Sequence, residues 1–281
     1  MYLQLPLSIS VLLELASARL ASVTETPDAE AEWLLAGLLG CTRTQLLLGD
    51  VAEPNAQQAA RFEQWLSRRV AGEPFAYITG EQPFHTLILR VTPDVLIPRA
   101  DTEHLVDWAL QLLLAAPASR VLDVCTGSGC VALAIAATQP SAEIIASDIS
   151  PAALRVALDN AARLGLHRVK FLLADGLPAS AGICDLIVGN PPYIAEGDTH
   201  LAALAHEPRQ ALVSGVDGLE CLRQLIAAAP AQLSQCGSLL MEHGHDQGAA
   251  VRALFEQAGF SGVQTRRDYG GNERVTGGYR P

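Results

Sequence analysis

Residues 122–132 read LDVCTGSGCVA, and this stretch decides the fold. RVLDVC (120–125) is an apolar run typical of a buried strand, and CVALAIAATQ, which begins at Cys130, is typical of a buried helix. Gly127 and Gly129 lie between them, where they let the backbone approach a ligand closely beside the free N–H groups of the helix N-terminus. The stretch therefore predicts a strand, a ligand-binding loop and a helix.

Strands and helices continue to alternate after this stretch. Further strands are predicted at EIIASD (143–148), VKFLLAD (169–175), CDLIVGN (184–190) and GSLLMEHG (237–244), with helices at 151–165, near 217–234 and at 246–258. Two terminal strands, GVQTRRD and ERVTGGYR, complete the set. Near-continuous apolar strands that alternate with helices predict an α/β fold with a parallel, doubly wound sheet covered on both faces. A ligand binds such a sheet at the carboxyl ends of the strands.

The first 73 residues predict a separate helical domain. SISVLLELASARL and DAEAEWLLAGLLG carry apolar residues three and four positions apart, and Ser10 is expected to cap the first helix. A third helix is predicted within AEPNAQQAARFEQWLSRRVAGEP, closing at Gly72 and Pro74. This part holds no cluster of catalytic residue types, so it is either a plain helical bundle or a docking module for a partner. Residues 74–98 contain short β-type runs separated by glycine and proline, which predict a hairpin linking two domains.

Composition narrows the class of function. The net charge of −11 argues against a surface that tracks nucleic-acid phosphates. The six cysteines form no CxxC pair and no Cys/His cluster, so we expect reduced thiols and no metal. The apolar start, MYLQLPLSISVLLELASARL, is not expected to be a signal peptide, because it has no basic region and is interrupted by Glu14. No apolar run is long enough to cross a membrane. We expect a cytoplasmic protein without a membrane partner.

Three aspartates lie in or at the ends of the first three predicted strands. Asp123 lies inside the first strand, where a carboxylate can pair with a ligand ammonium group. Asp148 ends the second strand and can accept hydrogen bonds from ribose hydroxyls, and Asp175 ends the third, beside Gly176, where it can accept an adenine amine. The glycine spacing also fits a dinucleotide fingerprint. Because Asp123 stands where a dinucleotide fold normally has an apolar residue, S-adenosylmethionine fits better than a nicotinamide cofactor.

The fourth strand leads into LIVGNPPYIAE (186–196), which carries Asn190, Pro191, Pro192 and Tyr193. Proline lacks an N–H donor and fixes φ, so this turn presents carbonyl oxygens in a rigid geometry. The Asn190 side-chain oxygen and the Pro191 carbonyl can accept both hydrogens of one planar NH2 group, over which Tyr193 can stack. Lining such a nitrogen up with a sulfonium methyl group promotes in-line transfer by orientation and by stabilising charge.

This turn resembles that of amino-methyltransferases that act on adenine N6, on guanine N2 and on glutamine amides. Other blocks occur in one collinear series with it, including VLIPRADTEHLV (95–106), HEPRQALVSGVDGLE (206–220), MEHGHDQG and RDYGGNERVTGG. Together they closely resemble the bacterial peptide chain release factor glutamine N5-methyltransferase family, over essentially the whole chain.

The resemblance implies three parts. These are a helical substrate-docking domain (1–73), a β-hairpin linker (74–98), and a class I, Rossmann-like methyltransferase domain (99–281) with a mostly parallel seven-stranded sheet and an antiparallel terminal strand. It also implies methylation of the glutamine amide in the Gly-Gly-Gln motif of class 1 release factors. S-adenosylmethionine would be the donor and S-adenosylhomocysteine the product, and no direct nucleic-acid partner is expected.

The same resemblance assigns site residues. It places the methionine part of the cofactor on Cys125, Thr126, Gly127, Ser128 and Gly129, the ribose on Asp148 and the adenine beside Asp175 and Gly176. It places the substrate amide on Asn190 to Tyr193. Cys125 stands where the family usually has glycine, and we expect cofactor binding to survive this change.

Three other functions stay open from the sequence. A nucleic-acid adenine N6-methyltransferase would share the turn, a non-catalytic cofactor-binding adaptor would share the loop, and a nicotinamide dehydrogenase would share the glycine spacing. Some polar residues also have two readings. Thr102 could line the cleft or start a helix, Glu207 could order a loop or form a surface ion pair, and His243 with His245 fits a turn better than a metal site.

Overall fold

The computed structural model describes residues 8–116 and 119–281, which form two compact units divided between Gly80 and Glu81. The boundary predicted at residue 73 falls inside the first unit, and the predicted linker (74–98) is shared between the two. Residues 1–7, at the start of the predicted helical domain, lie outside the described residues.

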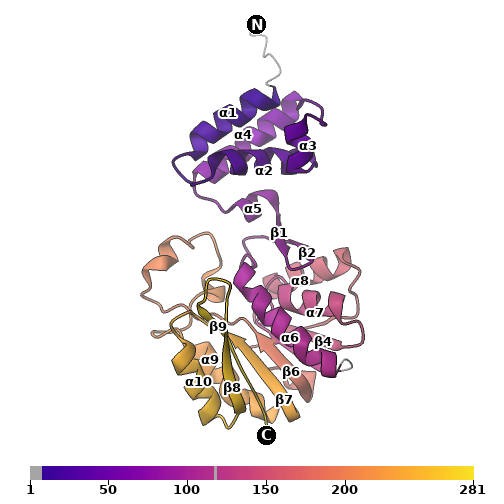
Figure 1. Ribbon diagram of the computed structural model, residues 1–281, viewed down its shortest axis with the longest axis vertical. Coiled ribbons are helices and arrows are strands. Elements are labelled where there is room, and N and C mark those ends of the chain that lie inside the picture. Colours follow the sequence, from indigo (N-terminus) through magenta and orange to yellow (C-terminus); the bar gives the residue numbers. More distant parts are fainter. Residues whose placement is uncertain (1–7, 117–118) are drawn as a thin grey trace. The chain divides into compact units, whose positions relative to one another are not determined.

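The first unit is a helical bundle (Figure 1). Its helices are α1 (Ile9–Leu20), α2 (Pro27–Leu39), α3 (Arg43–Leu48), α4 (Ala56–Val70) and α5 (Phe75–Thr79). The predicted cap of the first helix is wrong, because Ser8 and not Ser10 accepts the N–H of Val11. A capping box fixes the start of α4, where Asn55 and Gln58 bond each other's backbone N–H groups.

The segment Tyr77–Thr79 is helical, although its β-branched residues predict a strand. Pro74 precedes the first turn of α5, and Gly80, with a φ of 81°, ends it. Ile78 is buried in the core of the bundle with Phe62 and Leu34, so tertiary packing decides the conformation. The hairpin predicted in this region is formed by β1 (Glu81–Phe84) and β2 (Leu87–Arg90), which pair antiparallel.

The second unit contains the seven-stranded sheet that the sequence predicts. Its strands are β3 (Arg120–Val124), β4 (Glu143–Asp148), β5 (Lys170–Leu173), β6 (Cys184–Gly189), β7 (Leu233–Glu242), β8 (Ser261–Arg267) and β9 (Glu273–Tyr279). The order across the sheet is β5-β4-β3-β6-β7-β9-β8. Only β9 pairs antiparallel with its neighbours β7 and β8, so the antiparallel strand is last in the chain but lies inside the sheet. The class I methyltransferase fold is confirmed.

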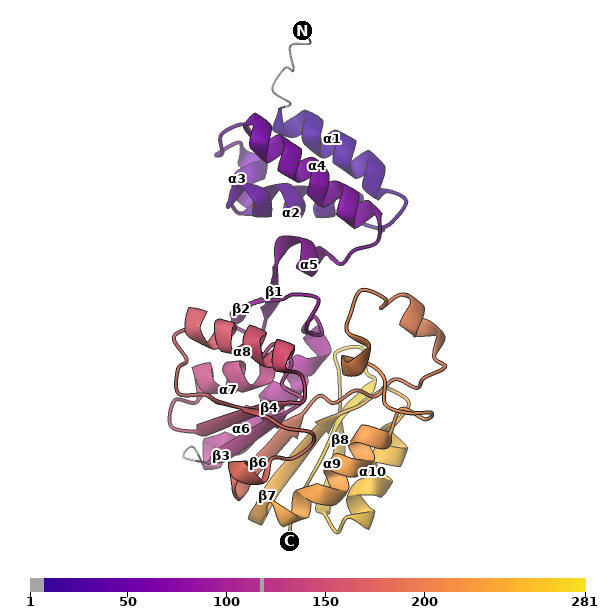
Figure 2. The ribbon, with the colours of Figure 1, turned by 180° about the vertical axis from the view of Figure 1, so that it is seen from behind.

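Helices cover both faces of this sheet (Figure 2). One core joins α6 (Glu103–Ala115), α7 (Cys130–Thr138) and part of α8 (Pro151–Arg163) to the sheet, and the other joins α9 (Glu220–Ala228) and α10 (Gly248–Gln257). Side chains along β7 alternate between the two cores, since Leu240 packs on the α6 side while Leu239 and Met241 pack on the α9 side. Glu242, the next residue, is therefore expected on the α6 side. In the described ranges, no helix is long and apolar enough to span a bilayer.

Candidate active site

A cavity of about 660 Å³ lies at the carboxyl ends of β3, β4, β5 and β6, where a parallel sheet normally binds its ligand. Most of the predicted site residues line it: Asp123, Cys125, Thr126, Gly127, Ser128, Asp148, Asp175, Gly176, Asn190 and Pro192. Gly129, Pro191 and Tyr193 are next to these residues in the chain but do not line the cavity. The fold thus brings the two predicted motifs, the glycine loop and the proline turn, to one site.

The glycine loop has two glycines with different functions. Gly127 has a φ of 56° and open space where a side chain would be, so its backbone faces the cavity directly. Gly129 has a φ of 84°, and a Cβ atom there would lie 3.0 Å from Leu133 Cδ1 and 3.2 Å from Ala157 Cβ. Gly129 therefore permits close packing of α7 and α8 behind the loop.

Asp123 is a buried carboxylate on the cavity wall, with only 1% of its surface exposed. Its Oδ2 atom accepts hydrogen bonds from the Thr126 hydroxyl at 2.5 Å and from the Ala132 N–H at 3.1 Å. Neither bond involves Oδ1. Burial raises the pKa of Asp123 to about 7, because desolvation disfavours the charged form. A cationic ligand group would restore the charged form, so the site suits an ammonium group.

Asp148 at the end of β4 supports the loop as well as the cavity. Its Oδ2 accepts the Gly127 N–H at 2.8 Å, and its Oδ1 accepts the Ser150 N–H at 2.8 Å. Burial raises the pKa of Asp148, and the two backbone bonds oppose that rise. A carboxylate oxygen can accept more than one bond, so Asp148 keeps acceptor capacity for a ligand hydroxyl.

The wall beside Asp175 is apolar. Ile149 and Leu177 both line the cavity with Ala174, and Ile149 is 44% exposed. The sequence analysis missed these residues. An exposed isoleucine directly after the strand-ending Asp148 is the signal that could have identified a surface for a flat, apolar ring.

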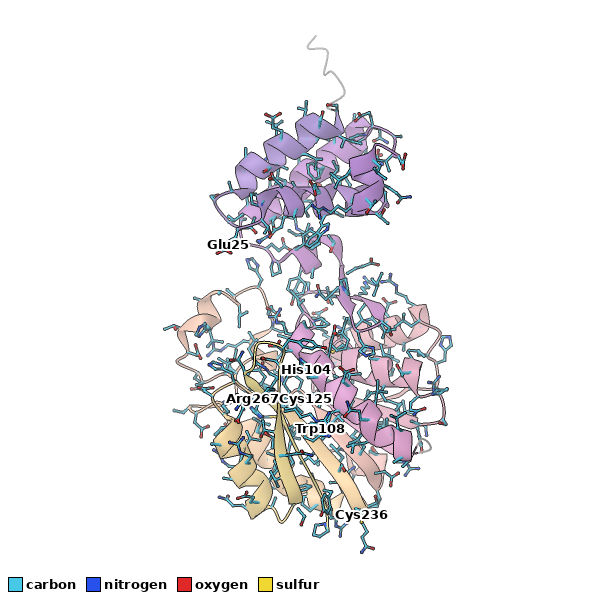
Figure 3. The ribbon with its side chains drawn as sticks, in the orientation of Figure 1. Glu25, His104, Trp108, Cys125, Cys236 and Arg267 are labelled. Carbon is cyan, nitrogen blue, oxygen red and sulfur yellow. The ribbon has the colours of Figure 1, made fainter. Side chains whose placement is uncertain are left out.

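Cys125, at the first position of the loop, has a left-handed backbone conformation with a φ of 59°. A hydrogen bond to the Cys221 thiol and burial raise the pKa of Cys125, so this thiol stays protonated at neutral pH. Cys236, the other cysteine with positive φ, lies at the opposite end of the unit (Figure 3). Cys125 is thus a packing residue of the cavity wall and not a nucleophile.

Asn190 follows β6 and is held by a residue far away in the chain. Its Nδ2 donates a hydrogen bond of 3.1 Å to Oγ1 of Thr102. Thr102 is 1% exposed, lines the cavity and ends the short helix η1 (Ala100–Thr102) before α6. Because Nδ2 is engaged, the Asn190 amide presents Oδ1 as its free acceptor. The structure supports both readings of Thr102, because it lines the cavity and also directly precedes α6 as its N-cap residue.

Tyr193 is partly buried and packs against the core beneath α9 and α10. Burial raises the pKa of Tyr193, so it stays a neutral phenol. Its backbone carbonyl accepts a hydrogen bond of 2.9 Å from Nε2 of Gln247. Pro191 is buried as well. The turn is therefore fixed by packing and by a distant glutamine that the sequence did not reveal.

A partly buried ion pair lies at the other side of the cavity, where Arg99 lines the wall. Glu207 is 8% exposed, forms an ion pair with the Arg99 guanidinium and accepts the Ile97 N–H at 3.1 Å. The segment from Asp94 to Arg99 contributes residues to the cavity wall. Glu207 thus links the loop that follows the Asn190–Tyr193 turn to the segment before α6, through a carboxylate that is itself buried.

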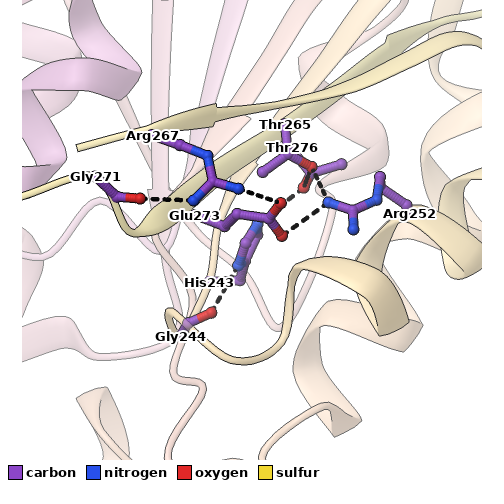
Figure 4. A network of polar contacts seen from close by, with 8 residues as sticks. All are labelled: His243, Gly244, Arg252, Thr265, Arg267, Gly271, Glu273 and Thr276. Carbon is purple, nitrogen blue, oxygen red and sulfur yellow. Dashed lines mark hydrogen bonds and ion pairs between the residues drawn. The ribbon is translucent and has the colours of Figure 1, made fainter.

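His243 and His245 do not form a metal site. His243 is buried and bonds the Gly244 carbonyl and the Thr276 hydroxyl, each at 2.8 Å, in a network that also places Glu273 between Arg252 and Arg267 (Figure 4). Burial lowers the pKa of His243, while His245 is exposed. In residues 8–116 and 119–281, no three His, Cys, Asp or Glu side chains are grouped to hold a metal.

Two family models and several known proteins match this chain. Residues 12–80 match the PrmC N-terminal domain, and residues 102–264 match the Methyltransferase small domain. A release factor glutamine methyltransferase of Bordetella pertussis is 48% identical over 258 residues, which cover 90% of this chain and 95% of the relative. A release factor glutamine methyltransferase of Xylella fastidiosa is 47% identical over 270 residues, covering 94% and 98%.

A solved structure resembles the fold alone. The ribosomal protein L11 methylase of Lactobacillus delbrueckii subsp. bulgaricus superposes with a TM-score of 0.52 at 22% identity, over 71% of this chain and 90% of that chain. At this identity the likeness concerns the arrangement of strands and helices and not the substrate.

Proposed function

This chain belongs to the release factor glutamine methyltransferases, and from this premise we propose that it methylates the glutamine side-chain nitrogen, N5, in the Gly-Gly-Gln motif of a class 1 release factor. The methyl donor is S-adenosylmethionine. The observation that carries the proposal is the bond from Asn190 Nδ2 to Thr102, which leaves Asn190 Oδ1 as an acceptor at the cavity. A planar primary amide supplies the N–H donors that such a site accepts.

The residues of the cavity fit the methyl donor. Asp123 would pair with its ammonium group, and the loop from Cys125 to Gly129 would hold the rest of its methionine part. Asp148 would accept the ribose hydroxyls, while Asp175 and Gly176 with the apolar wall would hold the adenine. When bound, S-adenosylmethionine supplies a methyl group on a positively charged sulfur. These assignments rest on position, burial and acceptor capacity.

The turn supplies orientation and charge. Asn190 Oδ1 and the Pro191 carbonyl would accept the two N–H bonds of the substrate amide, which fixes the plane of the nitrogen. An amide nitrogen is a poor nucleophile because its lone pair is delocalised. Positive charge develops on it during transfer, and the two oxygen acceptors stabilise that charge until the methylated nitrogen releases one N–H proton to solvent, while the donor leaves as neutral S-adenosylhomocysteine. Tyr193 would support the turn, as a neutral phenol.

We also propose that the helical domain (1–73) docks the protein substrate and that no nucleic acid binds. The match of residues 12–80 to the PrmC N-terminal domain and the net charge of −11 support these two assignments. A cytoplasmic location is the matching proposal, because translation termination takes place there and all six cysteines are free thiols.

Intact-mass analysis of a class 1 release factor, incubated with the enzyme and S-adenosylmethionine and then mapped by peptides, tests the proposal. We expect one added methyl group on the glutamine of the Gly-Gly-Gln peptide. A release factor with glutamate at that position is the matched control and should gain no mass. Methylation of the control, or transfer to DNA or RNA in place of the release factor, would contradict the proposed substrate.

A further inference from the structure

Glu242 is a buried carboxylate that none of the contacts above explains. It ends β7, its surface is 0% exposed, and neither of its carboxylate oxygens has a hydrogen-bond partner among the described residues. An unpartnered buried carboxylate costs folding free energy, since it gives up hydration and receives nothing in return. The presence of Glu242 at this position is therefore not explained by folding stability.

An ion pair does not supply that explanation. Arg274 is the cation near Glu242, and its guanidinium is already paired with Asp268 at 3.0 Å and with Asp101 at 3.1 Å. Asp101 adds a second negative charge to the surroundings of Glu242. Desolvation accordingly raises the pKa of Glu242 to about 7.

Two hydroxyl groups lie beside this carboxylate, and both belong to the catalytic turn or to its support. They are the hydroxyls of Thr102 and Tyr193. The strand register agrees, because Met241 pairs with Gly189, so Glu242 ends β7 at the level where Asn190 leaves β6. Glu242 does not line the cavity and would act from behind the turn.

The hydrogen bonds open to the Thr102 hydroxyl show how Glu242 would act on Asn190. Its Oγ1 atom accepts the N–H of Asn190, so its single hydrogen remains available for another acceptor. Glu242 is a carboxylate beside it with no other partner. A hydroxyl that donates to a carboxylate becomes a better acceptor, which strengthens the bond from Asn190 and opposes a flip of its amide.

We propose that Glu242 is a positioning residue for methyl transfer, whose carboxylate accepts from the Thr102 and Tyr193 hydroxyls and thereby fixes both ends of the Asn190–Tyr193 turn. The proposal rests on the function proposed above. Fixing Thr102 holds Asn190 Oδ1 toward the substrate amide, and fixing Tyr193 holds the far end of the turn. The effect belongs to kcat and not to cofactor binding.

The test compares Glu242→Gln, Thr102→Val and the double variant in methylation of a release factor, with S-adenosylmethionine affinity measured separately. We expect each single variant to lower kcat by about tenfold to a hundredfold, as small displacements of an orienting group do. The double variant should be no slower than the slower single variant, because both changes interrupt one chain of contacts. The affinity for S-adenosylmethionine should stay within about twofold of wild type for Glu242→Gln.

Matched variants separate positioning from folding. Thr276→Val removes a buried hydroxyl of the neighbouring strand β9 that contacts His243 and Thr265, so it should lower the melting temperature and leave kcat unchanged. Thr102→Ser keeps the hydroxyl and should keep most of the activity that Thr102→Val loses, a comparison that holds even if Glu242→Gln does not fold. Wild-type kcat in Glu242→Gln, or independent losses that multiply in the double variant, would overturn the proposal. An inactive wild-type enzyme would instead refute the proposed function.

Discussion

The cofactor side and the substrate side of the site each have a buried carboxylate, but the two carboxylates differ in how far away in the chain their neighbours lie. On the cofactor side, Asp123 bonds Thr126 and Ala132, which lie three and nine residues away in the chain. On the substrate side, Asn190 bonds Thr102 at a separation of 88 residues, and the Glu242 carboxylate lies beside the hydroxyls of Thr102 and Tyr193. The surroundings of Asp123 are assembled locally, by one strand and the loop and helix that follow it. The substrate turn depends on several distant elements at once.

This comparison predicts different effects of substitutions on the two sides. Loss of a cofactor-side group should lower the affinity for S-adenosylmethionine and leave kcat nearly unchanged. Loss of a turn-side group should lower kcat and leave that affinity nearly unchanged.

The largest effect is expected from Asn190→Ala. Removal of one preorganised acceptor should lower kcat by about a hundredfold to a thousandfold, while the affinity for S-adenosylmethionine stays within about threefold. Single-turnover methylation and calorimetric titration measure the two quantities. Asn272→Ala, a change in the β8–β9 turn away from the cavity, is the control and should keep wild-type kcat. An unchanged rate in Asn190→Ala would refute the role of the turn.

Glu242→Gln should change how stability depends on pH. The folded-state pKa of Glu242 is raised from 4.5 to about 7, so the contribution of Glu242 to stability is greatest below pH 4.5 and is lost as pH rises through 7. The variant lacks this loss and should gain up to about 3 kcal/mol relative to wild type between pH 5 and pH 8. Urea unfolding at both pH values measures the difference, and an identical pH slope in the two proteins would show that Glu242 is not a buried acid.

A somewhat smaller effect is expected from Asp123→Asn. A charge-assisted bond to an ammonium group is worth roughly 1.5–3 kcal/mol, so the affinity for S-adenosylmethionine should fall by about tenfold or more. Because the pKa of Asp123 is about 7, wild-type affinity should rise between pH 6 and pH 7.5 as the carboxylate ionises. Asp123→Asn should lose that rise. A variant with the wild-type pH profile would place the ammonium group elsewhere.

The smallest effect is expected from Cys125→Gly, which restores the family's usual loop residue. A non-glycine residue in the left-handed region costs roughly 1–2 kcal/mol, and the lost thiol packing offsets part of the relief. We expect a rise in Tm of about 2 °C and cofactor affinity within about threefold of wild type. More than a tenfold loss of affinity would mean that the thiol contacts the ligand and does not merely line the wall.

The same contrast explains how far the sequence predicts the molecule. The strands, the order of the units and the cofactor loop follow from local signals, because apolar runs, glycines and strand-ending acids lie close together in the chain. The helix α5 is not predicted from the sequence, because burial of Ile78 in the bundle outweighs the strand preference of residues 77–79.

The contacts that hold the Asn190–Tyr193 turn in place are the part of the site that the sequence predicts least. Thr102 and Gln247 are ordinary polar residues until the fold brings them to Asn190 and to the Tyr193 carbonyl. Glu242 lies in an apolar strand, where no periodic pattern separates a positioning carboxylate from a surface one. Contacts between distant elements leave no signal in a single sequence.

The most direct test of this division is methylation of a release factor by wild type, Asp123→Asn and Asn190→Ala across a wide range of S-adenosylmethionine concentrations. We predict that saturating cofactor restores Asp123→Asn to near the wild-type rate, since only donor binding is weakened. Asn190→Ala should stay about a hundredfold slow or slower at every concentration. Recovery of Asn190→Ala at high cofactor, or no recovery of Asp123→Asn, would contradict the separation between a locally built donor site and a distantly supported catalytic turn.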